Sequence, residues 1–156
     1  MDRDEISRLY RRLGPLIYRR CLKLLRDPDN ARDATQEVFV RAVKHKETLK
    51  ADRECLPWLY RVATNYCLNF IRDRKPRDDR APEEVLQASS GERRLAARQQ
   101  VFSILGEFDL KTQQIAVYSL LDGMTQEEIA EVMGLSRKTV GKKLSRFTDR
   151  AKELIA

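Results

Sequence analysis

At 156 residues the chain can form one buried core or two small modules, and its formal charge of +7 favours an acidic partner such as nucleic acid. No stretch approaches the roughly 18 apolar residues that span a bilayer, and the N-terminus lacks an apolar signal core, so we predict a cytoplasmic protein without membrane insertion. Three cysteines and one histidine without zinc-site spacing predict reduced thiols, no metal and no cofactor.

Three amphipathic helices are predicted in the first half of the chain. Apolar residues recur at helical spacing over residues 6–25, and Asp27-Pro28-Asp29 should end this first helix. A second helix is expected from Ala31. A third should cover residues 57–71, with Pro57 in its first turn, where a missing N–H costs nothing.

The segment RDRKPRDDRAPEEVLQASSGE, residues 72–92, replaces this periodicity with proline, serine and charge, which indicates an interdomain linker. Helical spacing resumes at Leu95 and continues to Leu121, before a stop at Asp122-Gly123. No strand pattern is present. We therefore expect an all-α protein with two small helical domains, at residues 1–75 and 93–156, and a flexible linker at 76–92.

A helix-turn-helix is predicted near the end of the chain. Thr125 and Glu128 have the spacing of a capping box, which should start a short helix over residues 126–133. Gly134 permits the left-handed conformation that ends such a helix, and Ser136 can cap the next one.

The second helix of this motif carries cations where its dipole disfavours them. Residues 136–152 hold seven Lys or Arg against one Asp, and two of these cations, Arg137 and Lys138, lie at the N-terminus. Each should cost a few tenths of a kcal/mol there, which DNA phosphates and guanine edges would offset. A helical hairpin with a solvated basic face is the alternative. The predicted DNA-contacting residues are Ser136, Arg137, Lys138, Thr139, Lys142, Lys143 and Arg146.

Four strings resemble the extracytoplasmic-function (ECF) sigma factors, compact promoter-recognition subunits of bacterial RNA polymerase. LYRRLGPLIYRRCLKLL, DATQEVFVRA and WLYRVATNYCLNFIRDR resemble the opening, polymerase-binding and promoter-melting helices of their region two. TQEEIAEVMGLSRKTVGKKLSRFTDRAKEL resembles the helix-turn-helix of region four. The resemblance implies a sigma factor, not an enzyme, that binds core RNA polymerase, recognises and opens promoter DNA and starts transcription. It also implies an anti-sigma factor as a partner.

The resemblance places a surface that binds core polymerase on the second predicted helix. Phe39, one of its members, could equally be a core residue, because an apolar side chain beside Val38 needs no partner. The implied polymerase-binding residues are Asp33, Gln36, Glu37, Phe39 and Arg41.

The resemblance also implies that a base flipped from the minus-10 promoter element is captured near Asn65. An amide can donate and accept along one base edge, and arginines beside it would follow phosphates. Asn65 could instead cap a helix terminus. The implied minus-10 residues are Leu49, Lys50, Arg61, Ala63, Asn65, Asn69, Arg72 and Arg74.

Three positions depart from the family pattern. Leu49 stands where many relatives have Phe, which removes a stacking contribution to the captured base. Gly141 replaces a usual Lys or Arg on the recognition helix and costs up to about 1 kcal/mol of helix propensity. Phe147 replaces a usual small residue and should change the packing at the end of region four.

Two other function classes fit parts of the sequence. A dimeric helix-turn-helix repressor would explain residues 125–144 but leave the first module unexplained. A sigma-like decoy would bind polymerase without starting transcripts. The chain ends eleven residues after Ser145, so we expect regulation by a separate protein and not by an added sensing domain.

Overall fold

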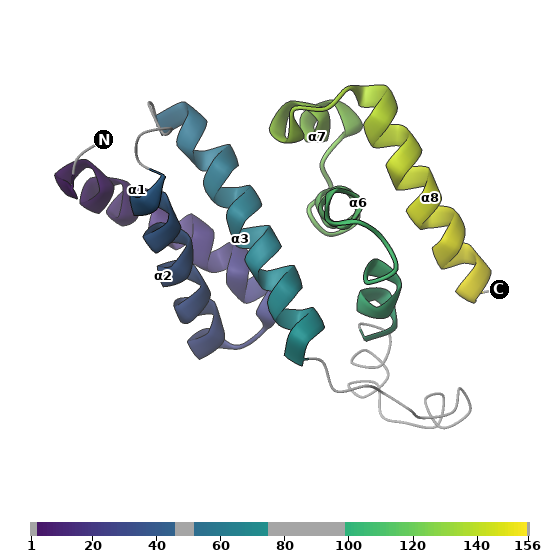
Figure 1. Cartoon of the computed structure of the whole chain (residues 1–156), viewed down its shortest axis with the longest axis horizontal. Helices are drawn as coiled ribbons and strands as arrows, with labels where there is room; N and C mark the ends of the chain where they lie inside the picture. The colour runs from purple at the N-terminus through teal and green to yellow at the C-terminus, as the bar shows by residue number, and fades with distance from the viewer. Residues whose placement is uncertain (1–2, 46–51, 75–98, 156) are drawn as a thin grey trace. The chain divides into compact units, whose positions relative to one another are not determined.

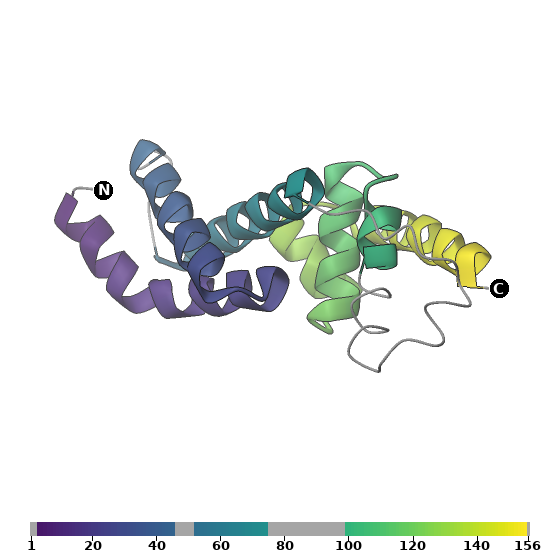
Figure 2. The ribbon, with the colours of Figure 1, turned by 90° about the horizontal axis from the view of Figure 1, so that it is seen from below.

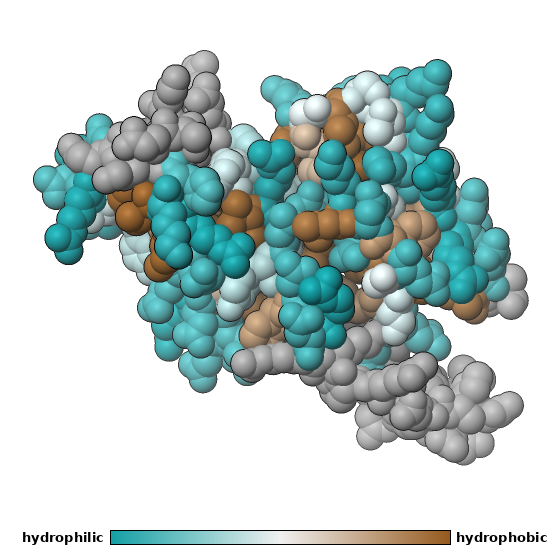
Figure 3. Space-filling view, viewed as in Figure 1, coloured by the Kyte–Doolittle hydropathy of each residue, from teal (hydrophilic) through white to brown (hydrophobic). Residues whose placement is uncertain are grey.

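The computed structural model describes residues 3–45, 52–74 and 99–155, and every regular element in these ranges is helical (Figure 1). The all-α prediction is confirmed. The chain divides into two compact units, Met1–Phe70 and Ile71–Ala156. Among the described helices, none combines the length and the apolarity needed to cross a membrane. Hydrophilic side chains cover most of the face seen in Figure 3, with apolar residues in small patches between them.

The first unit begins with two helices that pack closely on each other (Figures 1 and 2), α1 (Arg3–Leu25) and α2 (Pro28–Lys44). The predicted break between them is confirmed. Arg26 adopts a left-handed conformation with φ of 57°, and the side chain of Asp27 accepts a hydrogen bond from the amide of Asn30 at 2.9 Å. Because Asp27 caps the helix and Pro28 fits its first position, α2 begins three residues before the expected Ala31.

The third helix, α3 (Asp52–Arg74), is longer at both ends than predicted. It begins five residues before Pro57, which is therefore inside the helix and not in its first turn. One proline near a helix start removes a single i→i−4 hydrogen bond, and the rest of this long apolar helix keeps its bonds. Residues 72–74, assigned to the linker from their composition, are helical. The predicted linker at 76–92 lies outside the described residues.

A buried arginine joins α1 to α3 inside the first unit. Arg20 is only 3% exposed; its Nε donates to Oγ1 of Thr64 at 3.1 Å, and its guanidinium lies 4.7 Å from the ring centroid of Tyr60. A charge at such depth is stabilised by these polar and cation–π contacts. The core of this unit also contains aliphatic residues from all three helices and three free, buried cysteines, Cys21, Cys55 and Cys67.

The second unit contains a helical segment at 99–105 and then α6 (Leu110–Ala116), the π-helix η1 (Val117–Leu121), α7 (Gln126–Met133) and α8 (Arg137–Ile155). The π-helix was not predicted. Its wider turn changes the register after Tyr118, which is buried, so that Leu120 and Leu121 are 61% and 39% exposed. The helical spacing predicted up to Leu121 assumed an uninterrupted α-helix.

Helix α8 is held in the second unit by apolar contacts along its length. Val140 and Phe147 are buried, and the Phe147 ring meets Phe108 edge-on at 5.6 Å between centroids. Phe147 thus fills space beside Phe108 in this core. Ile129 and Met133 of α7 complete this core.

Candidate nucleic-acid interface

The predicted start and end of α7 are confirmed. Thr125 and Glu128 form a reciprocal capping box: the Thr125 amide donates to Oε1 of Glu128 at 3.0 Å, and the Glu128 amide donates to Oγ1 of Thr125 at 3.1 Å. The hydrogen bond from the Thr125 backbone, followed by that from its side chain, lowers the pKa of Glu128. Gly134 ends the helix with φ of 67°.

The turn that follows leads directly into the predicted recognition helix, α8. The Leu135 amide donates to the carbonyl of Ala130 at 3.0 Å, which closes the end of α7. Ser136 caps α8, because its Oγ accepts from the Thr139 amide at 3.1 Å and lies 2.9 Å from Oγ1 of Thr139. Ser136 and Thr139, both predicted to contact DNA, therefore also have a structural role in starting α8.

Three predicted DNA-contacting cations form an exposed row along α8. Lys138, Lys142 and Arg146 are spaced four residues apart, which places them on one side of the helix, and all three are exposed. Arg137, also exposed, pairs with Glu127 of α7 at 2.9 Å. An ion pair with both partners in solvent contributes at most about 1 kcal/mol, so Arg137 can exchange this partner for a phosphate at little cost.

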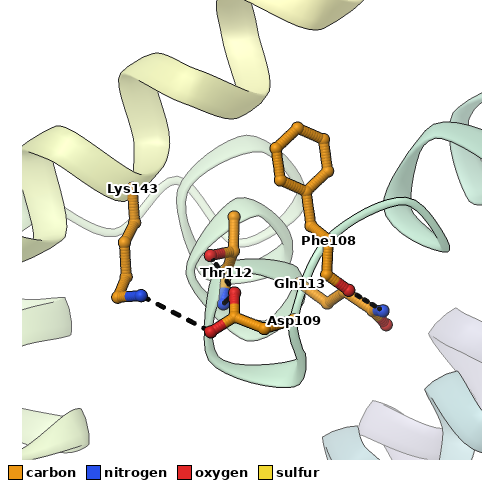
Figure 4. A network of polar contacts seen from close by, with 5 residues as sticks. All are labelled: Phe108, Asp109, Thr112, Gln113 and Lys143. Carbon is orange, nitrogen blue, oxygen red and sulfur yellow. Dashed lines mark hydrogen bonds and ion pairs between the residues drawn. The ribbon is translucent and has the colours of Figure 1, made fainter.

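Lys143 is different, because it points back into its own unit (Figure 4). Its side chain is 23% exposed, and its Nζ lies 3.4 Å from Oδ2 of Asp109, the residue that caps α6. The Thr112 amide donates to Oδ1 of Asp109 at 3.2 Å, and the Thr112 hydroxyl also donates to it. The Thr112 hydroxyl, then its amide and Lys143 lower the pKa of Asp109. Next to this cap, Nε2 of Gln113 donates to the Phe108 carbonyl at 2.9 Å.

Gly141 lies beside α7. A Cβ placed there would be 3.1 Å from Oε1 of Gln126, so the position faces the first turn of α7. This departure from the family pattern therefore lies away from the exposed row of Lys138, Lys142 and Arg146.

The predicted minus-10 residues of α3 fall into two groups. Arg61, Asn65, Asn69 and Arg72 have spacings of three and four residues and share one side of the helix, each at least partly exposed. Arg72 also pairs with the neighbouring Asp73 at 3.2 Å. Asn65 lies in the middle of α3, so the alternative that it caps a helix terminus is wrong.

The other minus-10 predictions are not on this face or are not described. Ala63 is fully buried and packs inside the first unit. Leu49, Lys50 and the side chain of Arg74 lie outside the described part of the chain.

On α2, the five predicted polymerase-binding residues differ in exposure. Asp33 and Gln36 are exposed, while Glu37 and Arg41 are half-buried and form an ion pair at 3.3 Å. Phe39 is 5% exposed and meets Tyr10 edge-on at 4.8 Å, which agrees with the core alternative.

Sequence reasoning missed two features of these surfaces. A groove of about 500 Å³ lies between α1 and α2, with Tyr10 and Pro15 on one wall and Gln36 on the other. An ion pair joins Arg150 of α8 to Glu107 at 2.7 Å, and it lowers the pKa of Glu107. No local sequence pattern links Glu107 to a partner 43 residues away. Within the described ranges, no cluster of His, Cys, Asp and Glu is suited to hold a metal ion.

Comparisons with known proteins match both units. The family model "Sigma-70 region 2" matches residues 9–77, and "Sigma-70, region 4" matches residues 98–146. The chain is 33% identical over 75 residues to the ECF RNA polymerase sigma factor SigW of Bacillus subtilis, an alignment that covers 48% of this chain and 40% of SigW. It is 30% identical over 128 residues to the RNA polymerase sigma factor CnrH of Cupriavidus metallidurans, covering 73% of this chain and 67% of CnrH. The chain thus spans less than half of SigW and about two thirds of CnrH.

Solved structures give the same result. The structure of CnrH in complex with the cytosolic domain of CnrY matches with a TM-score of 0.57 and 25% identity, over 99% of this chain and 89% of CnrH. The sigma factor RpoE of Bartonella quintana, in complex with the anti-sigma factor NepR, has the same fold, with a TM-score of 0.52 and 18% identity over 97% of this chain and 96% of RpoE. With regions two and four matched in order and CnrH as a relative, this chain belongs to the sigma-70 family, in its extracytoplasmic-function group.

Proposed function

We propose that this chain is a promoter-specificity subunit that binds core RNA polymerase, recognises promoter DNA and starts transcription. The observation that carries the proposal is the exposed row of Lys138, Lys142 and Arg146 on the second helix of a capped helix-turn-helix, in a chain that also contains sigma region two. A repressor would need only the helix-turn-helix. Region two is the part that a polymerase subunit requires in addition.

Each unit would have a separate task. In the second unit, the N-terminal half of α8 would enter the major groove of the minus-35 element, where Arg137 and Lys138 meet bases or phosphates. In the first unit, the face of α3 that carries Asn65 and Asn69 would hold a flipped minus-10 base. Ala63, which is buried, would support that face from behind.

The exposed face of α2 would bind the polymerase. Asp33 and Gln36 are exposed, whereas Glu37 forms an ion pair with Arg41. We propose no catalytic role for any of these residues. Flipping one base costs a few kcal/mol, which binding contacts can supply, so opening needs no chemical step in this subunit.

Run-off transcription with purified core enzyme tests the proposal. The chain should direct transcripts from a restricted set of start sites, and neutralising Lys138 and Lys142 together should reduce them. A repressor would bind DNA without core enzyme and yield no transcript, and a decoy would bind core enzyme and yield none. Absence of any initiation from a library of promoter fragments would refute the proposed function.

We also propose a cytoplasmic location and control by an inhibitory protein. CnrH is solved with the cytosolic domain of CnrY, and RpoE with an anti-sigma factor, which supports a similar partner for this chain. Such a partner should compete with core polymerase for the purified chain. A binding screen that recovers proteins able to block transcription would identify it.

A further inference from the structure

Helix α1 carries a row of cations on its outward face. Arg8, Arg12, Arg19 and Lys23 are all exposed, and their spacings of four, seven and four residues keep them on one side of the helix. The opposite side is the apolar one. The buried aliphatic residues of α1 are Ile6, Leu9, Leu13, Ile17 and Leu24. We call the four exposed cations the α1 stripe.

Beyond its first turn, helix α1 contains no acidic residue beside the α1 stripe. The acids of α1 are Asp4 and Glu5, both in the first turn, and residues 6–26 contain seven Lys or Arg and no Asp or Glu. Like charges four residues apart destabilise a helix by about 0.2–0.5 kcal/mol per pair. Arg8 with Arg12 and Arg19 with Lys23 are two such pairs. A polyanion lying along this face would relieve the repulsion within both pairs.

The geometry suits a linear polyanion. From Arg8 to Lys23 the helix rises about 22 Å, and duplex DNA carries one charge per about 1.7 Å of its axis, so the α1 stripe can lie along several phosphates. A protein partner is less well matched. Protein interfaces have an apolar centre with charge at the rim, whereas the exposed apolar residues among these cations are limited to Pro15 and Leu16.

We propose that the α1 stripe binds the phosphate backbone of promoter DNA, as a third DNA-contacting surface beside those of α3 and α8. The inference rests on the proposed function, because core polymerase brings the DNA to this unit. The contact is independent of base sequence, since phosphates alone are bound, and it adds affinity without changing which promoters are chosen.

The test uses holoenzyme assembled from the full chain and compares three double variants. Arg12→Gln with Arg19→Gln removes two charges of the α1 stripe while keeping good helix formers. Arg12→Lys with Arg19→Lys keeps both charges. Lys111→Gln with Lys152→Gln removes two exposed charges from the second unit as a matched control. Affinity for a promoter duplex and for a fragment with a premelted bubble is measured across a salt series.

The neutral α1 variant should reduce the slope of log affinity against log salt by roughly 1.8 for duplex contacts or 1.4 for single-stranded contacts, since each phosphate contributes about 0.9 or 0.7. The other two variants should keep the wild-type slope. A reduction on both fragments assigns the phosphates to duplex, and a reduction on the bubble alone assigns them to a single strand.

A wild-type slope for the neutral variant would overturn the inference alone. If that variant also bound core enzyme more weakly, the α1 stripe would be assigned to a protein contact. Failure of the wild-type chain to bind core enzyme or to prefer promoter DNA would overturn the proposed function and this inference together.

Discussion

The ammonium group of Lys143 on α8 lies 3.4 Å from Oδ2 of Asp109, the residue that caps α6. A cation of the recognition helix is thus bound to the helix behind it, 34 residues earlier in the chain. The pair helps to hold α8 against α6, and we expect it to influence where Lys138 and Lys142 would meet DNA. Lys143 is therefore expected to act through Asp109 more than through direct contact with phosphate.

Substitutions at these two positions should be coupled. Lys143→Gln and Asp109→Asn should each weaken minus-35 binding by holoenzyme up to about fivefold, because a partly exposed ion pair contributes at most about 1 kcal/mol. The double variant should be no weaker than either single one. Lys142→Gln combined with Asp109→Asn is the matched control and should be additive. An additive Lys143–Asp109 cycle would contradict the positioning role.

The cap of α6 should lose strength in acid. The pKa of Asp109 is lowered chiefly by the Thr112 hydroxyl, so its charged form stabilises the fold above its unfolded pKa of about 3.8. That contribution is lost as the pH falls through the lower pKa of the folded state. Asp109→Ala should therefore reduce the local stability of α6 by about 1 kcal/mol at neutral pH, and by less below the folded pKa.

Amide hydrogen exchange of α6 between neutral and acidic pH would measure this difference. Asp149→Ala, at an exposed position of α8, serves as a control. An α6 difference that stays constant down to the most acidic condition would show that the Asp109 charge is not involved.

Two glycines of the helix-turn-helix should respond in opposite directions to alanine. Gly141→Ala should stabilise the second unit by about 0.5–1 kcal/mol, because alanine is the better helix former. The atom that a new Cβ meets, Oε1 of Gln126, is at the end of a flexible side chain that can move. Gly134→Ala should destabilise it by about 1–2 kcal/mol, since φ of 67° strains any Cβ. Thermal unfolding of both variants tests the pair, and equal signs would be inconsistent with it.

Removing acidic charge from α2 should weaken binding to core polymerase. Asp33→Asn with Glu37→Gln should reduce affinity at least tenfold if both carboxylates are covered in the complex. Asp29→Asn, an exposed acid in the first turn of the same helix, is the control and should have little effect. Affinity is measured by titration of labelled chain with core enzyme, and equal behaviour of the two variants would place the polymerase elsewhere.

The parts of the structure that sequence could predict are those governed by short-range rules. Thr125, Glu128 and Gly134 form a cap and a stop from positions a few residues apart, so local pattern was enough to place α7. Family resemblance then supplied the assignment of both modules.

Long-range packing is what sequence could not supply. The burial of Phe39 depends on Tyr10 across a helix pair, and that of Ala63 on the rest of the first unit. The pairing of Lys143 depends on Asp109 in another helix. The π-helix at Val117–Leu121 shifts which side chains face inward, whereas a regular α-helical period would have continued unchanged. Each miss therefore involves a contact or a backbone form that neighbouring residues do not encode.

Promoter opening should depend on the side chain of Asn65. Asn65 lies in the middle of α3, on its partly exposed face between Arg61 and Asn69. Asn65→Ala removes an amide that could bind the edge of a flipped base, and one lost hydrogen bond of this kind costs about 1–3 kcal/mol. Open complexes should therefore fall by about fivefold or more, while the affinity for closed duplex stays near that of the wild type. A fluorescent base analogue in the minus-10 element reports unstacking directly.

Arg61→Gln is the matched control on the same face and should instead reduce the salt dependence of binding, because its partner would be a phosphate. If Asn65→Ala opens the promoter as well as the wild type, base capture must belong to other residues.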